Sequence, residues 1–132
     1  MGIPQPKKKK QSVSKLKKQL WLLVRQEVFK KYGRDCYTCD SKNLSGVNLQ
    51  GGHVPWPGSI LSTECKYDIR FLRPQCYLCN IHRGGMGAMA LERMQREGID
   101  TEALWEHNLI TKGGSYGTFW FQNKIAELDP IH

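Results

Sequence analysis

The sequence predicts a small α+β fold in which helices flank a core held together by cysteines. Apolar residues recur at helical spacing towards both ends of the 132-residue chain. The middle of the chain is instead rich in Gly and Pro with short extended segments, and two Cys-x-x-Cys pairs enclose it. This length suits a single domain.

Basic residues are concentrated in the N-terminal third. The net charge is +8, and residues 1–31 contain ten Lys or Arg against one acid, whereas the remainder contains ten against eleven. We expect residues 1–12 to be a disordered basic arm that precedes a domain at 13–132. Such an arm favours a polyanionic partner, although a solubilising tail would have the same composition.

No segment resembles a membrane span or a signal peptide. The longest apolar run, Leu20–Val24, is far shorter than the roughly 20 residues that a spanning helix needs. We therefore expect a cytoplasmic protein without a membrane partner.

The first helix is predicted over residues 14–31. Ser12 or Ser14 can cap its start and Gly33 can end it. Its apolar face comprises Leu16, Leu20, Leu23, Val24 and Val28.

The middle of the chain is predicted to be mostly irregular. Residues 40–52 fit a small β-hairpin, and the prolines that follow force a loop to about residue 66. Residues 67–72 suit an extended piece. Three further helices are expected: 88–97, ended by Gly98; 101–108, capped by Asp100 or Thr101; and 119–128.

The cysteines indicate a structural zinc site. Cys36, Cys39, Cys76 and Cys79 form two Cys-x-x-Cys pairs, and Cys65 is left over and expected to pack in the core. Reduced thiols in this pattern favour metal over disulfides. Four thiolates complete the tetrahedral shell of Zn²⁺ and leave no position for water. Four ordinary free cysteines are the alternative.

A histidine and an asparagine stand beside these pairs in an informative order. His53 follows two glycines between the pairs, and Asn80 follows the second pair directly. A zinc ion joining the two pairs would bring His53 and Asn80 to one phosphate. His53 could then act as a general base, while Mg²⁺ or Mn²⁺ near Asn80 would polarise the phosphoryl oxygen. Taken singly, the histidine can be a surface residue and the asparagine a helix cap.

This arrangement resembles the NinG (Rap) recombination nucleases of lambdoid phages and, more distantly, phage recombination endonuclease VII. The resemblance covers about residues 20–128, including the last helix. It is carried by Cys36-Tyr-Thr-Cys39, Leu49-Gln-Gly-Gly-His53, Lys66-Tyr-Asp68 and Arg73-Pro-Gln-Cys76-Tyr-Leu-Cys79-Asn80-Ile-His82. It implies a ββα-metal (HNH, treble-clef-like) core and a metal-dependent endonuclease acting on branched DNA such as Holliday junctions. It also implies a homodimer, in the host cytoplasm if the protein is phage-encoded.

The sequence departs from the HNH pattern at two positions. Gly52 stands where many such enzymes have a metal-binding carboxylate, as a glycine also does in NinG. Phe71 replaces the central asparagine that, in many HNH motifs, orients the loop carrying the general base, here His53. Asp68 is the candidate to complete the shell of the catalytic metal, with Glu64 as the alternative, although Asp68 can equally bond Arg70 or a turn.

Further residues are candidates for contacts with substrate. His82 is a candidate for the metal or the phosphate, or else a capping or surface imidazole. Trp56 can stack on an exposed base, but a place in the core is favoured. The predicted DNA contacts are Lys7, Lys8, Lys9, Lys10, Arg70, Arg73 and Arg83.

Three functions compete. A structure-selective DNA endonuclease is favoured by the His53–Asn80 pair. A noncatalytic zinc-dependent DNA-binding accessory is favoured by Gly52 and Phe71. A less selective HNH nuclease is not excluded by any residue.

Overall fold

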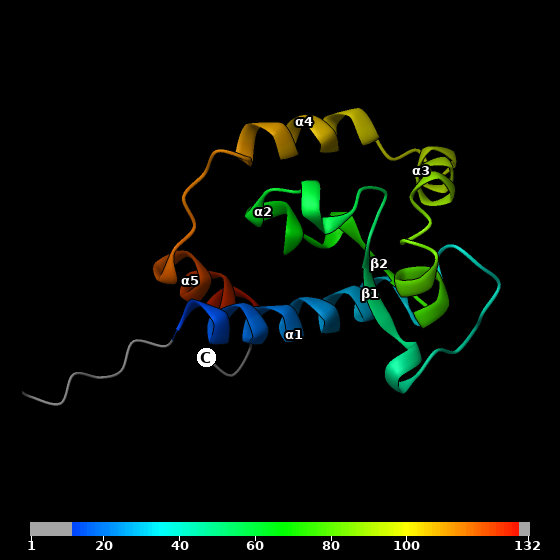
Figure 1. Ribbon diagram of the computed structural model, residues 1–132, viewed down its shortest axis with the longest axis horizontal. Helices are drawn as coiled ribbons and strands as arrows, with labels where there is room; N and C mark the ends of the chain where they lie inside the picture. Colours follow the sequence, from blue (N-terminus) through cyan, green and yellow to red (C-terminus); the bar gives the residue numbers. More distant parts are fainter. Residues whose placement is uncertain (1–11, 130–132) are drawn as a thin grey trace, which may run out of the picture.

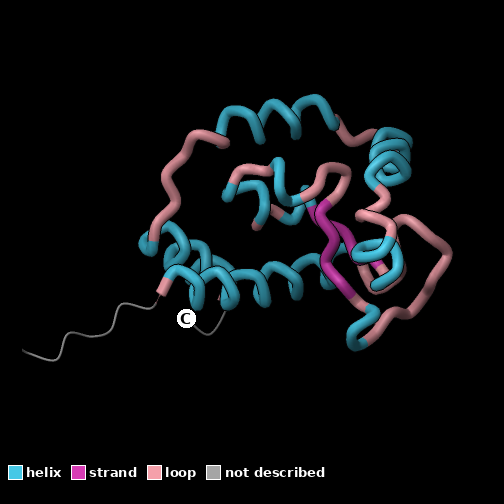
Figure 2. Tube along the Cα trace, viewed as in Figure 1, coloured by secondary structure: helices cyan, strands magenta, loops and turns pink. Residues whose placement is uncertain are grey.

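The computed structural model describes residues 12–129. Two short strands lie at the centre, and helices surround them (Figures 1 and 2). Three-residue 3₁₀ turns occur at Gly46–Asn48, Gly58–Ile60 and Ile69–Phe71 (η1 to η3). The other elements are, in order, α1 (Val13–Tyr32), β1 (Gln50–His53), α2 (Thr63–Lys66), β2 (Leu72–Gln75), the π-helical turn η4 (Leu78–His82), α3 (Gly87–Arg96), α4 (Thr101–Thr111) and α5 (Thr118–Leu128). The predicted α+β class is confirmed.

Helix α1 is the longest element, and α5 packs along it (Figure 1). Ser12 caps its start, because its hydroxyl accepts a hydrogen bond of 3.2 Å from the backbone N–H of Lys15. Gly33 ends it with φ +85°, a left-handed conformation that favours glycine. The buried positions are Leu16, Leu20, Val24 and Val28. The predicted helix is therefore confirmed, with Ser12 as its cap.

The sheet joins segments that are distant in sequence. β1 and β2 are antiparallel, and their register pairs Gln50 with Gln75 and His53 with Leu72. The local hairpin predicted over residues 40–52 is wrong. Residues 36–44 instead close a loop with backbone bonds from Cys36 N to Ser41 O (2.9 Å) and from Leu44 N to Arg34 O (2.8 Å).

The extended piece predicted at residues 67–72 is also wrong for most of its length. Asp68 caps η3 by accepting a bond of 2.9 Å from the backbone N–H of Arg70, so the chain turns before it enters β2 at Leu72. Local capping competes here with the extended conformation.

The C-terminal helices follow the predicted pattern. Asp100 caps α4 by accepting a bond of 3.0 Å from Ala103 N, and α4 extends three residues beyond its expected end. The buried side chain of Asn108 ties α4 to the loop below it, because it accepts from Ser62 N and donates to Ile60 O. None of the described helices has the length and hydropathy needed to cross a membrane.

The remaining core predictions are confirmed. Trp56 packs against the hydrophobic core, with its ring 4.9 Å from that of Trp105 and 6.1 Å from that of Phe71. Cys65 is fully buried in the same cluster. The predicted basic arm lies almost wholly outside the described residues.

Candidate functional site

The four paired cysteines converge on one point. Their sulfur atoms all lie within 4.8 Å of one another, and the Sγ atoms of Cys39 and Cys76 are 3.7 Å apart. Tetrahedral Zn²⁺ with bonds of about 2.3 Å requires sulfurs about 3.8 Å apart. Within residues 12–129 this is the only group of three or more His, Cys, Asp or Glu side chains arranged to hold a metal. The structure thus supports the predicted metal-binding cluster, and its sulfur ligands suit zinc.

Backbone N–H groups point at the sulfurs. Cys36 Sγ accepts from Cys76 N at 3.3 Å, Cys76 Sγ from Cys79 N at 3.4 Å, and Cys39 Sγ from Ser41 N at 3.5 Å. Donors of this kind stabilise thiolates. Burial raises the pKa of the Cys39 thiol, but hydrogen bonds from Ser41 and the neighbouring cysteines outweigh it and lower that pKa to about 6.

The side chain of His53 is held in one orientation. Its Nε2 lies 2.9 Å from the carbonyl oxygen of Lys66, and its ring packs on that of Trp21 from α1, with ring centroids 5.5 Å apart. A carbonyl only accepts, so Nε2 carries the proton and Nδ1 of the neutral ring keeps a free lone pair. Burial lowers the pKa of His53 below its ordinary 6.5, which favours this neutral form.

Gly58 lies close to Nδ1 of His53 and carries no side chain that would collide with it. A Cβ at this position would lie 2.9 Å from Nδ1, closer than side-chain carbons come to other atoms. The Lys66 carbonyl and Gly58 were both missed by the sequence analysis. A backbone acceptor leaves no trace in residue identity, and Gly58 was interpreted only as part of a loop.

Asn80 also has a defined orientation. Gln50 Nε2 donates to Val47 O (3.0 Å), so Gln50 Oε1 accepts from Asn80 Nδ2 (2.7 Å). Asn80 Oδ1 has no hydrogen-bond partner within residues 12–129. Its side chain lines a pocket of about 580 Å³ with Trp21, Arg25 and Gly51. An amide oxygen in an open pocket is a suitable ligand for a hard divalent cation.

His53 and Asn80 approach this region without touching. Asn80 bonds Gln50 at the start of β1, whereas His53 ends β1. At 3.3 Å per residue, the backbone positions of Gln50 and His53 are about 10 Å apart. Trp21 links the two, because it contacts the His53 ring and lines the Asn80 pocket.

Steric packing explains why glycine occupies position 52. A Cβ there would lie 1.7 Å from Gln75 Oε1 and 2.6 Å from Gln75 Cδ. The buried side chain of Gln75 thus occupies the space where a carboxylate side chain would begin. Any residue with a Cβ at position 52 would require the Gln75 side chain to move.

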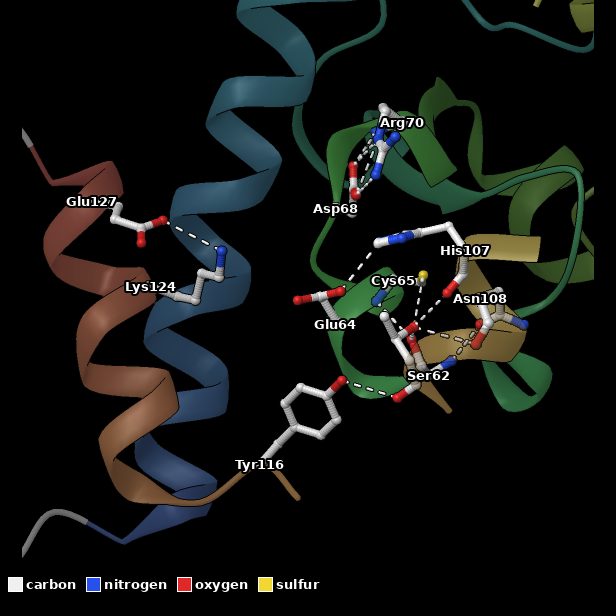
Figure 3. A network of polar contacts seen from close by, with 11 residues as sticks. Ser62, Glu64, Cys65, Asp68, Arg70, His107, Asn108, Tyr116, Lys124 and Glu127 are labelled. Atoms are coloured by element: carbon white, nitrogen blue, oxygen red, sulfur yellow. Dashed lines mark hydrogen bonds and ion pairs between the residues drawn. The ribbon is translucent and has the colours of Figure 1, made fainter. Parts of the chain in front are cut away.

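Asp68 and Glu64 are engaged elsewhere (Figure 3). Both carboxylate oxygens of Asp68 accept from Arg70, with Oδ2 2.7 Å from Nη2, and Glu64 lies 3.2 Å from His107 Nε2. All four side chains line a pocket of about 380 Å³, which does not include Asn80. The structure therefore does not bring Asp68 and Asn80 together, which argues against Asp68 as a ligand of a metal that Asn80 would hold.

The predicted arginine contacts differ in exposure. Arg73 is only 3% exposed. It donates to the carbonyl oxygens of Ile69, Arg70 and Leu72 and stacks 4.0 Å from the centre of the Tyr32 ring. This occupied geometry argues against a phosphate contact, whereas Arg70 and Arg83 are exposed.

A basic pocket beside the cysteines was missed by the sequence analysis. Arg83, Arg93 and Arg96 line a pocket of about 550 Å³ with Tyr37 and Cys39. Arg93 is fixed in it, since it donates to Tyr37 O at 2.7 Å and stacks 4.1 Å from the centre of the Tyr37 ring. The spacing of Arg93 and Arg96 on one helical face was the signal available in the sequence.

The remaining predicted substrate contacts are His82 and the lysines of the N-terminal arm. His82 is exposed at the end of η4, with its ring 5.2 Å from that of Tyr77. The predicted DNA contacts Lys7, Lys8, Lys9 and Lys10 lie outside the described residues.

No protein-family model matches the chain, and no curated protein or solved structure matches it significantly. The functional interpretation therefore depends on this geometry and on the motif resemblance.

Proposed function

We propose that the protein is a metal-dependent DNA endonuclease with a zinc-containing ββα-metal (HNH) core, selective for branched DNA such as Holliday junctions. The observation that carries the proposal is the fixed His53 ring, with Nε2–H bound to the Lys66 carbonyl and Nδ1 free. The order of β1, β2 and η4 around the four cysteines agrees with such a core. Junction preference rests on the motif resemblance alone.

In this proposal His53 is the general base. Water attacks the phosphorus atom while its proton passes to Nδ1 of His53. The bond from phosphorus to the 3′-oxygen breaks, and this oxygen takes a proton from solvent water, leaving a 3′-hydroxyl and a 5′-phosphate. Trp21 and the Lys66 carbonyl hold the ring in one orientation, in which Nδ1 is the nitrogen able to accept this proton.

Asn80 would supply one oxygen ligand to a catalytic divalent metal. Mg²⁺ or Mn²⁺ bound there would stabilise charge on the phosphoryl oxygen and the leaving 3′-oxygen. Gln50 orients the amide so that Oδ1 is the available atom. Asp68 and its alternative Glu64 would not be ligands of this metal. Phosphate oxygens or water would complete its coordination shell.

Two exposed arginines near η4, Arg83 and Arg96, suit contacts with the DNA backbone. Arg83 follows η4 directly, and Arg93 and Arg96 line the same pocket. Arginine binds phosphate through two parallel N–H groups. Arg70 and the arm lysines Lys7 to Lys10 would add contacts, and His82 would contact either the metal or a phosphate.

A noncatalytic zinc-dependent DNA-binding accessory is the second candidate. Two observations favour it: Gln75 fills the space of the missing carboxylate at Gly52, and the described residues hold no second metal-ligand cluster of His, Cys, Asp or Glu. For the endonuclease, a homodimer would suit symmetric cutting of a junction, since two strands must be cut.

The test compares a synthetic four-way junction with a matched linear duplex in Mg²⁺ or Mn²⁺. We expect the zinc-loaded full chain to cut the junction, and His53→Ala to lower the cleavage rate by about 10²–10⁴-fold. Junction affinity should be unchanged in this variant.

His107→Ala is the matched control, because His107 is also half-buried but pairs with Glu64 away from Asn80. It should retain full activity. Binding without cleavage in every metal would support the accessory instead. Equal cutting of the linear duplex would remove branch selectivity and leave a less selective nuclease.

A further inference from the structure

Gln75 is a buried polar residue that connects three segments. It ends β2 immediately before Cys76 and is fully buried. Its Nε2 donates to Gly85 O at 2.7 Å and to Thr38 Oγ1 at 2.9 Å. Its Oε1 is the one buried side-chain nitrogen or oxygen without a hydrogen-bond partner within residues 12–129. Burying an amide with one atom unsatisfied is unfavourable, so the two hydrogen bonds that Gln75 does make are needed to hold its side chain in place.

The donor and acceptor roles along this chain of atoms are determined. Gly85 O only accepts, which places the NH₂ end of Gln75 towards it. The second N–H of that NH₂ group then donates to Thr38 Oγ1, so the Thr38 hydroxyl uses a lone pair to accept it. The hydroxyl proton of Thr38 is therefore available to donate a hydrogen bond to another acceptor.

A cysteine sulfur lies within hydrogen-bonding range of the Thr38 hydroxyl and can accept that proton. Thr38 lies between the ligands Cys36 and Cys39 in the first Cys-x-x-Cys pair and is 5% exposed. Its Oγ1 is 3.7 Å from Cys36 Sγ, within hydrogen-bonding range for sulfur. The bonds therefore run in one direction, from the Gln75 amide through the Thr38 hydroxyl to a thiolate.

We infer that Thr38 and Gln75 are positioning residues for the metal centre, delivering a directed hydrogen bond to the Cys36 thiolate. A Zn²⁺ ion with four thiolates carries a net charge of −2, and a buried neutral donor offsets part of it. Gln75 also packs directly on Gly52, the residue before His53. The same amide thus connects the cysteine cluster to the strand that carries the proposed base.

The test measures metal binding rather than cleavage, so it stands apart from the proposed nuclease function. Thr38→Val removes the hydroxyl and keeps the shape, and Thr38→Ser keeps the hydroxyl. With Zn²⁺ alone and a competing chromophoric chelator, we expect the Zn²⁺ dissociation constant of Thr38→Val to rise about 10–100-fold. Thr38→Ser should stay close to the wild-type protein.

A second measurement separates this role from general destabilisation. In protein saturated with Co²⁺, the sulfur-to-cobalt charge-transfer band should move to lower energy in Thr38→Val, because a thiolate without its hydrogen bond is a stronger electron donor. The band should not move in Thr38→Ser. An unmoved band and unchanged Zn²⁺ affinity in Thr38→Val would overturn the inference, as would equal effects in the two variants.

Discussion

Two regions of this molecule, a cysteine half and a helical half, are held together by different physical means, and a separate buried cluster includes residues of α2, α3 and α4. The cysteine half, residues 34–50 and 74–86, has few buried apolar side chains besides the cysteines, chiefly Leu44 and Leu49. The helical half is built on α1 and α5 with Leu72 of β2, and it buries seven residues in one cluster. Ligand bonds hold the first half, and apolar burial of about 25 cal/mol per Å² holds the second.

Strand β2 belongs to both halves. Leu72 packs in the helical half, and Cys76 lies four residues later in the cluster. His53 pairs with Leu72 across the sheet and contacts Trp21 on α1. The proposed base is therefore positioned where the two halves meet, which requires both to be intact.

Removing the metal should have the largest effect. Structural zinc sites contribute roughly 10–16 kcal/mol of binding free energy. We expect chelation to abolish amide-exchange protection in residues 34–50 and 74–86, while the centre of α1 stays protected. Cys79→Ser should lose the metal, whereas Cys65→Ala, outside the cluster, should keep one zinc per chain. An exchange pattern unaffected by chelation would contradict the division into two halves.

The helical half should respond to loss of apolar volume. Phe121 is fully buried, with its ring edge-on to Tyr67 at 5.6 Å. Phe121→Ala should lower the free energy of unfolding by about 3–5 kcal/mol in urea titrations of zinc-loaded protein.

Phe119 gives the control on the same helix, because it is 76% exposed. Phe119→Ala should change stability by no more than about 0.5 kcal/mol. Equal losses in the two variants would show that α5 is not held by its buried face.

Overpacking at the junction of the halves should have a smaller effect. Gly52→Ala places a Cβ against the Gln75 amide, and we expect a loss of about 1–3 kcal/mol. Gly51→Ala is the matched neighbour, since its Cβ would meet Arg25 Cγ at an ordinary 3.4 Å. Thermal unfolding of both variants should rank Gly52→Ala as the less stable; the reverse order would contradict the packing around Gln75.

The smallest effect concerns pH. The pKa of His53 in the folded protein lies below 6.5 because burial disfavours the charged ring. The unfolded chain thus binds this proton more readily, so stability should fall as pH drops below about 6.5 towards the folded-state pKa. His53→Gln should show a shallower decline between pH 7.5 and 5.5 in urea unfolding. Identical slopes would mean that the ring titrates normally in the folded protein.

Elements that are stabilised by residues close in sequence were predicted better than elements that depend on a distant partner. The helices were predicted closely because apolar spacing and caps such as Ser12 and Asp100 lie within a few residues of the turns they stabilise. The hairpin over residues 40–52 was wrong because the partner of β1 is β2, which no local pattern marks. Asp68 is an exception, because its cap on η3 is local, yet this cap won over the extended conformation that the sequence pattern favoured.

By itself, the sequence determined the helices, the α+β class and the four cysteines that gather into one cluster. Thiolate spacing and helical periodicity are local chemistry, so residue identity suffices for both. Only the tertiary structure decided which atoms face the candidate site. It selected the Lys66 carbonyl for His53, the Gln50 amide for Asn80 and the Gln75 side chain over Gly52. These are contacts between segments distant in sequence, and some of them use backbone atoms that every residue shares.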